Sequence, residues 1–519
     1  MIFKELPSNF SPVEIFEHFQ YYPYSFFLDS ALKSHSFGRY SFIGSEPFLI
    51  FKSKNNRIQI LQKGKNQNLK GNPWDILQSL LSHYQVDSGT VPFFSGAVGY
   101  FSYDLGRHLE RLPNHTVDDL NLPDCYLCFY DTVIVFDHWE KKTWVCSTGI
   151  REKTTKLRKQ CAENELKKIV NDMQKRITEN GRQMVYRQKF GQMNSGQQDS
   201  KFVSNFSYDN YLKAVEKAKD YIAQGEIYQV NLSQRFMGTV PEWGPSSWVV
   251  YKTLREINPA PFAAYLNFPE VKIVSASPER FLRISGRHVQ TRPIKGTRPR
   301  AENLTEDGKL ANELLQSKKD RAELVMIVDL ERNDLGRVCE YGTVKVPKLV
   351  TLEKYPTVYH LVGTVEGILC EDKTHLDCLR ACFPGGSITG APKIRSMEII
   401  EELEPTKRSI YTGSIGYLGF NGETDLNIVI RTLLFTPLEI PKTHRAIRNF
   451  YAEGSKVSRF LTGFTQGRVY FQVGGGIVAD SEPEAEYQET LDKAKALFAC
   501  LNRQTIQTDY YGCKLIKSV

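Results

Sequence analysis

From about residue 206 to about residue 502 the chain alternates between helical and strand patterns, and this alternation constrains the fold more than any other feature. Apolar residues recur with helical spacing or in short β-type runs, and prolines mark where segments begin and end. A polar, basic segment at 436–466 interrupts the regularity. The alternation predicts a body of mixed helices and strands. Helices are expected over Tyr208–Gln224, Lys309–Arg337 and Pro392–Glu404, and a strand over Tyr228–Phe236.

The rest of the chain divides by composition into three regions. Residues 1–150 are rich in short strand patterns separated by Gly, Pro and Asn. Residues 151–205 are polar and charged, and we interpret them as a linker on a solvated surface with a polar helix over Arg151–Asn180. Residues 503–519 form a C-terminal tail. A chain of 519 residues is long enough for roughly two to four domains, or for one large composite domain.

The charge of the chain argues against a nucleic-acid partner. The net charge is +8, but residues 151–200 hold twelve basic and six acidic residues, which leaves only +2 for the remainder. A near-neutral body is a poor binder of nucleic acid. No apolar run approaches the ~20 residues that span a bilayer, and the N-terminus lacks the pattern of a secretory signal. We therefore expect a cytoplasmic protein that binds neither nucleic acid nor membrane.

The ten cysteines are scattered along the chain. Cys125 and Cys128 form a CxxC pair, but there is no second pair at zinc spacing and no flanking βαβ pattern. Reduced thiols buried in a cytosolic protein are the simpler interpretation.

Three acidic clusters are candidates for chemistry. Asp320 and Glu323 share one face of a predicted helix, and Glu486, Glu489 and Lys493 share another. A third carboxylate, Glu279, follows a strand-like run. Acidic helix faces are usually just solvated. These lie next to apolar or glycine-rich segments, and carboxylates on two helices also suit Mg²⁺, which takes one or two carboxylates and completes its shell with water and ligand oxygens.

Two glycine-rich segments, Gly385–Lys393 and Gly474–Gly476, either form tight turns or bring bare backbone amides close to an anion. The first ends on the helix that begins at Pro392, so Ser387 and nearby amides could hold a carboxylate. It is not a Walker A loop, because GxxxxGK[ST] is absent. Composition and spacing alone thus indicate a cytosolic enzyme that binds an anion with Mg²⁺.

Six longer motifs resemble the chorismate-binding enzymes, a family that includes anthranilate synthase component I, aminodeoxychorismate synthase component I, and the isochorismate and salicylate synthases. The resemblance is strong over 206–502 and weaker over 1–150. It implies an α/β fold of the α+β type, like that of anthranilate synthase component I, with large antiparallel sheets packed face to face and helices outside. The motifs are PIKGTRPR (293–300), DLERNDLGRVC (329–339), GGSITGAPKIRSMEII (385–400), GSIGYLG (413–419), IVIRT (428–432) and GGGIVADSEPEAEYQET (474–490).

Two positions distinguish the branches of this family. The water-adding branch carries an activating lysine where this chain has Gln229, and glutamine is no general base, so water-adding chemistry is disfavoured. Anthranilate synthases usually read PIAGT where this chain reads PIKGT with Lys295. The lysine form resembles the branch that makes 4-amino-4-deoxychorismate for p-aminobenzoate and folate synthesis. The runner-up is the anthranilate-forming branch of tryptophan synthesis.

The resemblance also implies roles for individual residues. Lys295 matches the ring nucleophile and Glu279 the general acid for the departing hydroxyl, which is a poor leaving group unless protonated. Glu323 and Glu489 match the Mg²⁺ ligands, with Glu486 beside them. Substrate binding is implied for Thr297, His360, Ser387, Tyr411, Arg431, Gly475, Gly476 and Lys493.

No cysteine of this chain lies in a glycine-rich nucleophile elbow, so we expect no glutaminase domain fused to it. The family further implies a separate glutamine amidotransferase subunit as the nitrogen source. The N-terminal region resembles the part of anthranilate synthase that holds tryptophan, through Ser30 and the NPAPF run at 258–262. Ala260 stands where the regulatory pattern commonly has serine, so tryptophan binding is left open. A non-catalytic scaffold is the alternative from another class, but it would be expected to lose the acids that remain here.

Overall fold

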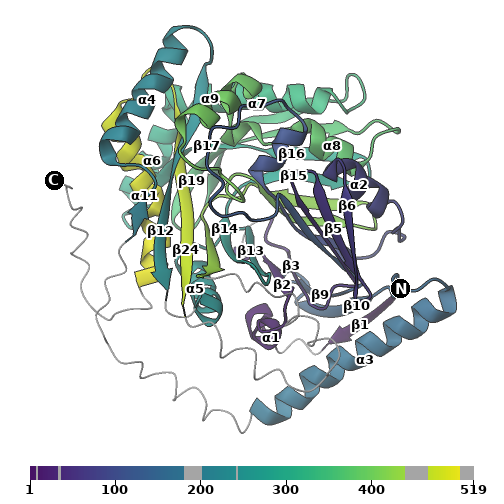
Figure 1. Ribbon diagram of the computed structural model, residues 1–519. Coiled ribbons are helices and arrows are strands. Elements are labelled where there is room, and N and C mark those ends of the chain that lie inside the picture. Colours follow the sequence, from purple (N-terminus) through teal and green to yellow (C-terminus); the bar gives the residue numbers. More distant parts are fainter. Residues whose placement is uncertain (7–9, 33–36, 181–201, 241–242, 439–465, 503–519) are drawn as a thin grey trace.

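The computed structural model describes the chain except residues 7–9, 33–36, 181–201, 241–242, 439–465 and 503–519. The tail and nearly all of the 436–466 insertion therefore lie outside the described residues. The described strands form two 12-stranded sheets, here called sheet A and sheet B, in which every strand pairing is antiparallel (Figure 1).

Sheet A places strands from both ends of the chain side by side. Besides the strands in the order below, the sheet contains the short strand β20 (Gly390–Ala391), which pairs with β12 (Gln229–Val240). The order is β1 (Ile2–Leu6), β10 (Lys142–Ser147), β9 (Thr132–Asp137), β3 (Tyr40–Gly44), β2 (Phe26–Asp29), β13 (Phe262–Asn267), β14 (Lys272–Ser277), β23 (Thr432–Pro437), β24 (Gly467–Ile477), β12 (Gln229–Val240) and β11 (Val203–Ser204).

Sheet B is built in the same way, with β18 (Lys345–Lys354) pairing with β19 off the main path. The order is β17 (Ile294–Pro299), β19 (Val358–Ile368), β16 (His288–Arg292), β15 (Arg280–Ser285), β22 (Glu423–Asn427), β21 (Ser414–Gly419), β7 (Gly96–Phe101), β8 (Cys125–Tyr130), β4 (Leu49–Lys54), β5 (Arg57–Gln62) and β6 (Lys65–Lys70).

The N-terminal 150 residues contribute strands to both sheets. Strand β2 pairs with β13, where Leu28 opposes Ala264, and β7 pairs with β21, where Gly99 opposes Gly416. Gly99 has no room for a side chain, because an added Cβ would lie 1.9 Å from the carbonyl oxygen of Tyr126. The two sequence regions therefore share continuous sheets in the folded molecule.

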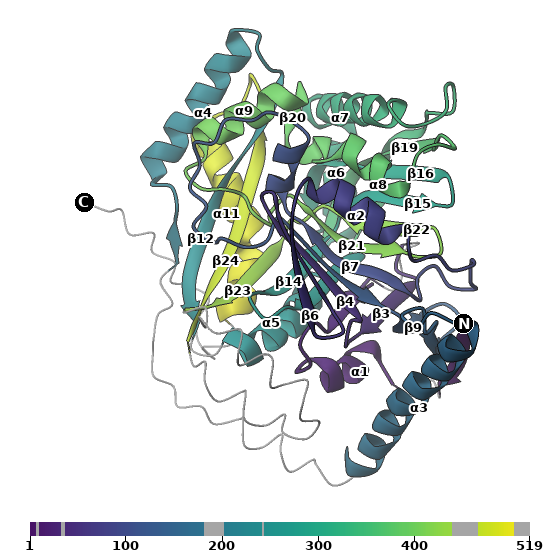
Figure 2. The same ribbon diagram turned by 45° about the vertical axis from the view of Figure 1, so that its right-hand side comes forward.

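Three apolar layers follow from this arrangement. Side chains such as Phe42 and Leu266 of sheet A meet Ile50 and Tyr126 of sheet B in a buried core between the sheets. Helices cover the outer faces (Figures 1 and 2). On sheet A these are α1 (Pro12–Phe19), α3 (Thr155–Asn180), α5 (Trp243–Ile257) and α11 (Pro483–Asn502), and on sheet B α2 (Pro73–Leu81), α6 (Leu304–Gln316), α7 (Lys318–Gly336) and α8 (His375–Cys382).

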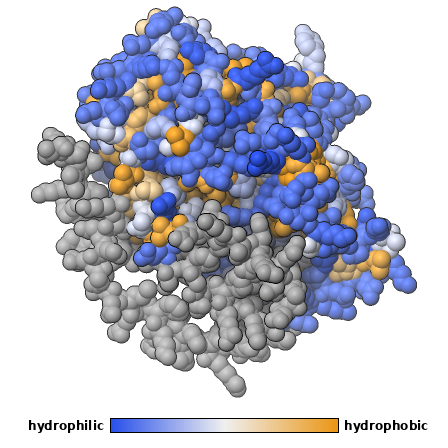
Figure 3. All heavy atoms as spheres, in the orientation of Figure 1, coloured by the Kyte–Doolittle hydropathy of each residue, from blue (hydrophilic) through white to orange (hydrophobic). Residues whose placement is uncertain are grey.

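A fourth, smaller cluster joins α4 (Tyr208–Ala223) and α9 (Lys393–Leu403) to strand β12. Two short 3₁₀ helices, η1 (Tyr103–His108) and η3 (Gly386–Ile388), complete the described helices. The face of the molecule in Figure 3 is mostly hydrophilic with scattered apolar patches. Among the described residues no helix is both long enough and apolar enough to cross a membrane.

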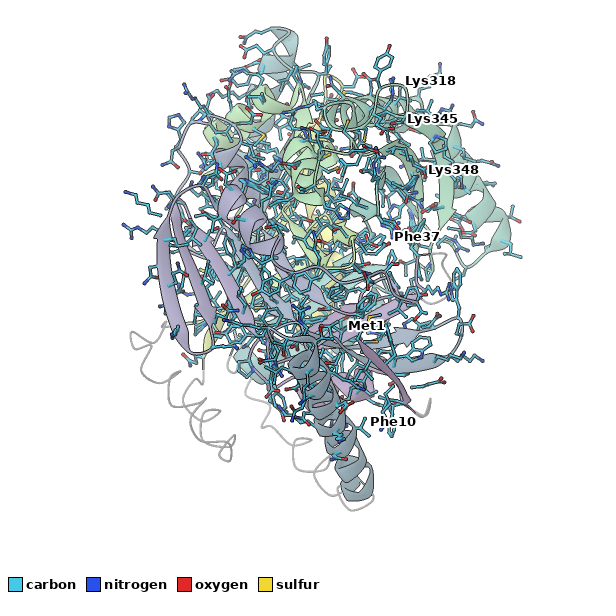
Figure 4. All side chains as sticks on the ribbon, turned by 90° about the vertical axis from the view of Figure 1, so that its right-hand side faces the viewer. Met1, Phe10, Phe37, Lys318, Lys345 and Lys348 are labelled. Atoms are coloured by element: carbon cyan, nitrogen blue, oxygen red, sulfur yellow. The ribbon has the colours of Figure 1, made fainter. Side chains whose placement is uncertain are left out.

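The expected fold class is confirmed, while two local expectations need correction. The helix expected over 309–337 is two helices, α6 and α7, because Ser317 ends the first and its side chain accepts the backbone N–H of Asp320 to begin the second. The expected linker contains α3, which is not wholly solvated: Ala162 and Leu166 are buried against sheet A. Figure 4 shows Lys318, at the start of α7, at the same end of the molecule as Lys345 and Lys348 of β18.

Candidate active site

The candidate residues gather where the chain changes sheet. Glu279 lies at the crossing from β14 of sheet A to β15 of sheet B, and Arg431 at the crossing from β22 back to β23. The two crossings are hydrogen-bonded to each other. The N–H of Ile428 donates to the carbonyl of Glu279, and that of Ala276 to the carbonyl of Arg431, each at 3.1 Å. Residues from both sheets thus converge on one place.

Lys295 of β17 is the amine at the centre of this site. Its Nζ donates to the carbonyl oxygen of Ser387, on η3, at 3.0 Å. Burial lowers the pKa of Lys295 below its ordinary value, although Glu323 and Glu279 favour the charged form. An amine with a lowered pKa is neutral, and therefore nucleophilic, at a lower pH than an exposed lysine.

Glu279 is a buried carboxyl group close to that amine. It is 4% exposed, and its Oε1 accepts the backbone N–H of Ile294, next to Lys295, at 3.4 Å. Burial raises its pKa, while Ser387 and Lys295 act in the opposite direction. A carboxyl that keeps its proton to a higher pH is suited to act as an acid.

Three further carboxylates come from two helices. Glu323 lies on α7, and Glu486 and Glu489 lie on α11. Burial raises the pKa of Glu323 and of Glu486. Burial also opposes ionisation of Glu489, but Lys493, with Lys319 and Lys295, outweighs it and lowers the pKa. The Nζ of Lys493 lies 2.7 Å from Glu489 Oε1 and donates to the carbonyl of Gly474 at 2.9 Å.

The glycines of β24 make room for these carboxylates. The segment Gly474–Gly476 lies within a strand and is not a turn. A Cβ on Gly475 would lie 3.1 Å from Glu486 Oε2 and 3.6 Å from Glu489 Oε1. Glu486 Oε1 accepts the hydroxyl of Ser481 at 2.6 Å, whereas its buried Oε2 has no partner among the described residues.

This donor set fits Mg²⁺. Within the described part of the chain no three ligating side chains lie close enough together to enclose a metal by themselves. Mg²⁺ does not need such an enclosure, because one or two carboxylates, water and substrate oxygens complete its octahedron. The unpartnered Glu486 Oε2, and the proximity of Glu323 to Glu489 across two helices, leave hard oxygen donors available for such an ion.

His360 and Thr297 face each other on paired strands beside Lys295. They are register partners on β19 and β17, and Thr297 Oγ1 lies 2.8 Å from His360 Nδ1. Burial lowers the pKa of His360 to about 3, with a further contribution from Arg431, so the imidazole is neutral at physiological pH. Its Nε2 is buried without a partner among the described residues and remains available to a ligand.

Arg431 and Tyr411 lie on loops that lead into and out of sheet B. Arg431 has a positive φ of 51° and donates from Nη1 to Asn258 Oδ1 at 3.2 Å. Burial lowers the pKa of this arginine and raises that of Tyr411. The backbone N–H of Tyr411 donates to the backbone carbonyl of Arg408, and the buried guanidinium of Arg408 pairs with Glu404. The guanidinium of Arg431, in contrast, has no carboxylate partner among the described residues, and such a fork is suited to hold a carboxylate.

Two side chains of this site carry more than the sequence motifs indicate. Gln229, treated above only as a replacement for lysine, is fully buried and donates from Nε2 to Glu323 Oε2 at 3.2 Å. Arg408 lies outside the six motifs, and its ion pair with Glu404 fixes the loop of Tyr411. The sequence gives no signal for Arg408, because the helix α9 ends at Leu403 and the Glu404–Arg408 pair lies beyond it.

A separate cavity of about 490 Å³ lies between the sheets on the N-terminal side. It brings together Ser30 and the NPAPF run, because Ser30 Oγ donates to the carbonyl of Pro261 at 3.3 Å. Phe37, labelled in Figure 4, lines the same cavity, and its ring lies 4.9 Å from the guanidinium of Arg280, the residue after Glu279.

Comparisons with known proteins agree with this architecture. The family model described as "chorismate binding enzyme" matches residues 15–440 and 457–499. Anthranilate synthase component 1 of Acetivibrio thermocellus is 37% identical over 95% of this chain and 92% of its own. Aminodeoxychorismate synthase component 1 of Bacillus subtilis is 38% identical over 92% of each chain. The crystal structure of anthranilate synthase component I from Streptococcus pneumoniae superposes with a TM-score of 0.69 at 30% identity, covering 88% of this chain and 91% of that one.

The family match spans most of the chain, and the relatives are matched over nearly their whole length. The half-buried lysine, the acids around it and the antiparallel double sheet are therefore features of a chain that belongs to the chorismate-binding enzyme family.

Proposed function

We propose that this protein is the chorismate-aminating component of a cytoplasmic aminodeoxychorismate synthase. It would convert chorismate and ammonia to 4-amino-4-deoxychorismate and water, with ammonia from glutamine supplied by a separate amidotransferase subunit. Relatives that bear the names of both aminating enzymes match this chain equally well. The choice between the two products therefore rests on one observation, the half-buried amine of Lys295 held against the carbonyl of Ser387.

The proposed chemistry uses Lys295 as a nucleophile. Its neutral amine attacks C2 of the chorismate ring, the ring double bond shifts, and the C4 hydroxyl departs as water with a proton from Glu279. Ammonia then adds at C4 with the reverse shift, which breaks the lysine–C2 bond. The carboxylate of Glu279 takes up the proton that the new ammonium group loses. The enolpyruvyl group stays on the ring, so the product is 4-amino-4-deoxychorismate. Atoms and charge balance over the two steps.

The other side chains would bind and orient the substrate. Arg431, with Tyr411 on the neighbouring loop, would hold the enolpyruvyl carboxylate, and His360 with Thr297 would face the ring. Ser387, Gly475, Gly476 and Lys493 would complete the contacts. Glu323 and Glu489, with Glu486, would hold Mg²⁺, which when bound neutralises the ring carboxylate and draws electron density from the ring.

Anthranilate synthesis is the second candidate. It is supported by relatives of that name and by the cavity that joins Ser30 to the NPAPF run, the region whose resemblance suggests tryptophan. This reaction ends with elimination of pyruvate. Lys295 argues against it, because the matching motif of that branch usually carries alanine at this position.

The deciding experiment is mass analysis of the products that the purified protein forms from chorismate, Mg²⁺ and ammonium at alkaline pH. Aminodeoxychorismate without anthranilate is expected, and Lys295→Ala should abolish it. Anthranilate with pyruvate would reject the assignment by Lys295. If nothing forms, adding an amidotransferase partner and glutamine separates an obligatory complex from a non-catalytic protein. Added tryptophan, with its binding measured by calorimetry, tests the N-terminal cavity.

A further inference from the structure

Arg408 is a buried, charged side chain that the proposed mechanism does not use. It is 3% exposed and lies between α9 and β21, on the segment that leads to Tyr411. A guanidinium group carries five N–H donors in one rigid plane and keeps its charge in a protein. Burying such a group is costly unless its donors are satisfied, so the partners of Arg408 indicate its role.

The donors of Arg408 are divided between one carboxylate and three neighbouring segments. Nε and Nη2 donate to the two oxygens of Glu404, at 3.0 and 2.7 Å, and form a bidentate ion pair. Nη2 also donates to the backbone carbonyl of Asn231 on β12 at 2.8 Å, and Nη1 to that of Ile388 on η3 at 2.9 Å. Nη1 donates in addition to Thr412 Oγ1 at 3.4 Å. The five N–H groups are thereby all used.

One set of these contacts reaches the proposed nucleophile. Ile388 directly follows Ser387, whose carbonyl accepts the Nζ of Lys295 at 3.0 Å. The same carbonyl accepts Asn231 Nδ2 at 3.2 Å. Arg408 therefore holds both the carbonyl next to that of Ser387 and the backbone of the residue that shares it with Lys295.

A second set of contacts reaches the side of the site proposed to hold the enolpyruvyl carboxylate. The backbone N–H of Tyr411 donates to the backbone carbonyl of Arg408 at 3.1 Å, and the centre of the Tyr411 ring lies 5.9 Å from the guanidinium carbon. The ring of Tyr103, in η1, lies 4.9 Å from the same carbon. Aromatic faces at these distances attract a guanidinium and help to orient it.

The ion pair is anchored in sheet A, whereas the segments that it holds are not part of a sheet. Glu404 Oε1 also accepts the backbone N–H and the hydroxyl of Ser233, on β12, at 2.9 and 2.6 Å. In contrast, η3 is a single short turn, and Tyr411 lies outside the described helices and strands. The guanidinium thus ties two irregular segments to one strand.

We propose that Arg408 is a positioning residue that couples the two halves of the active site, because it holds the backbone that orients Lys295 and the loop that carries Tyr411. Its donors are all taken, so it acts through these segments and not by contact with the substrate. The inference rests on the proposed amination of chorismate but does not depend on which of the two amino products is released.

The test uses Arg408→Lys, which keeps the charge beside Glu404 but presents its donors from one point instead of a fork. With purified protein, chorismate, Mg²⁺ and ammonium at alkaline pH, kcat should fall at least about tenfold, because small displacements of reacting groups are costly in rate. The KM for chorismate should rise at least about threefold, and the KM for ammonium should stay within about threefold of wild type.

Arg151→Lys is the matched control, and its kcat and KM values should equal those of wild type. Arg151 is also partly buried and pairs with two carboxylates, Asp131 and Glu165, and its Nε donates to Cys161. None of these partners belongs to the site. The control therefore reports what the exchange of an ion-paired arginine for lysine does to stability alone.

A second readout does not need turnover. Acetic anhydride acylates neutral amines, so the pH dependence of labelling at Lys295, read by mass spectrometry of its peptide, gives the pKa of that amine. The carbonyl of Ser387 favours the ammonium form by accepting its N–H, so its displacement should lower the pKa of Lys295 in Arg408→Lys and not in Arg151→Lys.

Unchanged kcat, KM and Lys295 labelling, together with a lower Tm, would overturn the proposal and leave Arg408 as a structural ion pair. If Arg408→Lys does not fold, Tyr103→Leu takes its place, because it removes one aromatic face from the guanidinium and leaves the hydrogen bonds of Arg408 intact. Its kcat should fall at least about threefold, and a wild-type kcat would again reject the coupling. Failure of the proposed amination shows separately, as the absence of any amino product from wild type.

Discussion

At the scale of single residues, the site pairs a buried carboxyl group, Glu279, with a half-buried amine, Lys295. The proposed chemistry needs the carboxyl protonated and the amine neutral, the reverse of their exposed states. We predict that Glu279→Gln lowers kcat by roughly 10²–10⁴-fold, the usual contribution of a general acid. The amide keeps an acceptor for the N–H of Ile294, so the Tm should change little. The kcat of the variant and of wild type is measured by steady-state amination with saturating ammonia. The Tm of both proteins is measured by thermal unfolding.

The same residues predict the pH profile. Burial lowers the pKa of Lys295, so the wild-type rate should rise with pH as its ammonium group loses a proton. Burial raises the pKa of Glu279, so the rate should fall as pH rises through that value and the acid form is lost. In Glu279→Gln the falling limb should disappear while the rising limb stays. A falling limb that persists in the variant would assign the acid to another group.

At the scale of elements, the short helix η1 connects the N-terminal region to the loop of Tyr411. Asp104 in η1 is 5% exposed, and its Oδ2 accepts the backbone N–H of Ser409 at 2.9 Å. Ser102, which begins η1, donates from its hydroxyl to the carbonyl of Ser409 at 2.7 Å. Through these contacts Ser102 and Asp104, from the N-terminal region, position the loop that carries Tyr411.

Asp104 also gives a stability prediction. Burial raises its pKa to about 6, above the ordinary 3.8. Between these values the folded state binds more protons than the unfolded state, so the free energy of unfolding falls as pH rises. Asp104→Asn should remove this contribution, which is at most about 3 kcal/mol at 1.36 kcal/mol per pH unit. Urea unfolding between pH 4.5 and 7.5 checks it, and equal slopes for both proteins would contradict it.

The elements that could be predicted from the sequence are those whose signals are local. The helix α9 lies where Pro392 and Pro405 bracket an apolar stripe, although Ile394 of that stripe is 45% exposed. The break at Ser317 was missed, because a serine inside a helical pattern gives a weaker signal than proline. The roles of Lys295 and Glu279 come from motifs carried over from the family, and they stay predictions. The contact of Gln229 with Glu323 depends on tertiary packing and leaves no signal in a single sequence.

At the scale of the whole molecule, the division of the sequence at about residue 150 is not a division of the structure. Ten of the 24 described strands come from the first 150 residues, five in each sheet. They supply the pairing partners of β13 and β21 and more than half of the buried core residues described between the sheets. Without these strands, the edges of β13 and β21 that now pair with β2 and β7 would be exposed to water. The apolar faces of the two sheets that now form the core between them would be exposed as well.

We therefore predict that residues 202–519 expressed alone will not fold, even though they contain every proposed catalytic residue. Loss of β2 leaves the edge of β13 from Ala263 to Leu266 without a partner, although β13 still pairs with β14. Loss of β7 does the same to one edge of β21 (Ser414–Gly419), which still pairs with β22. The fragment should aggregate and show no cooperative unfolding transition. Co-expression with residues 1–180 should restore a soluble complex that aminates chorismate, because the pairing needs only the strands and not a continuous chain. A folded, monomeric and active 202–519 fragment would show that sheet continuity is dispensable for the site, and that the motif-bearing region is a domain in its own right.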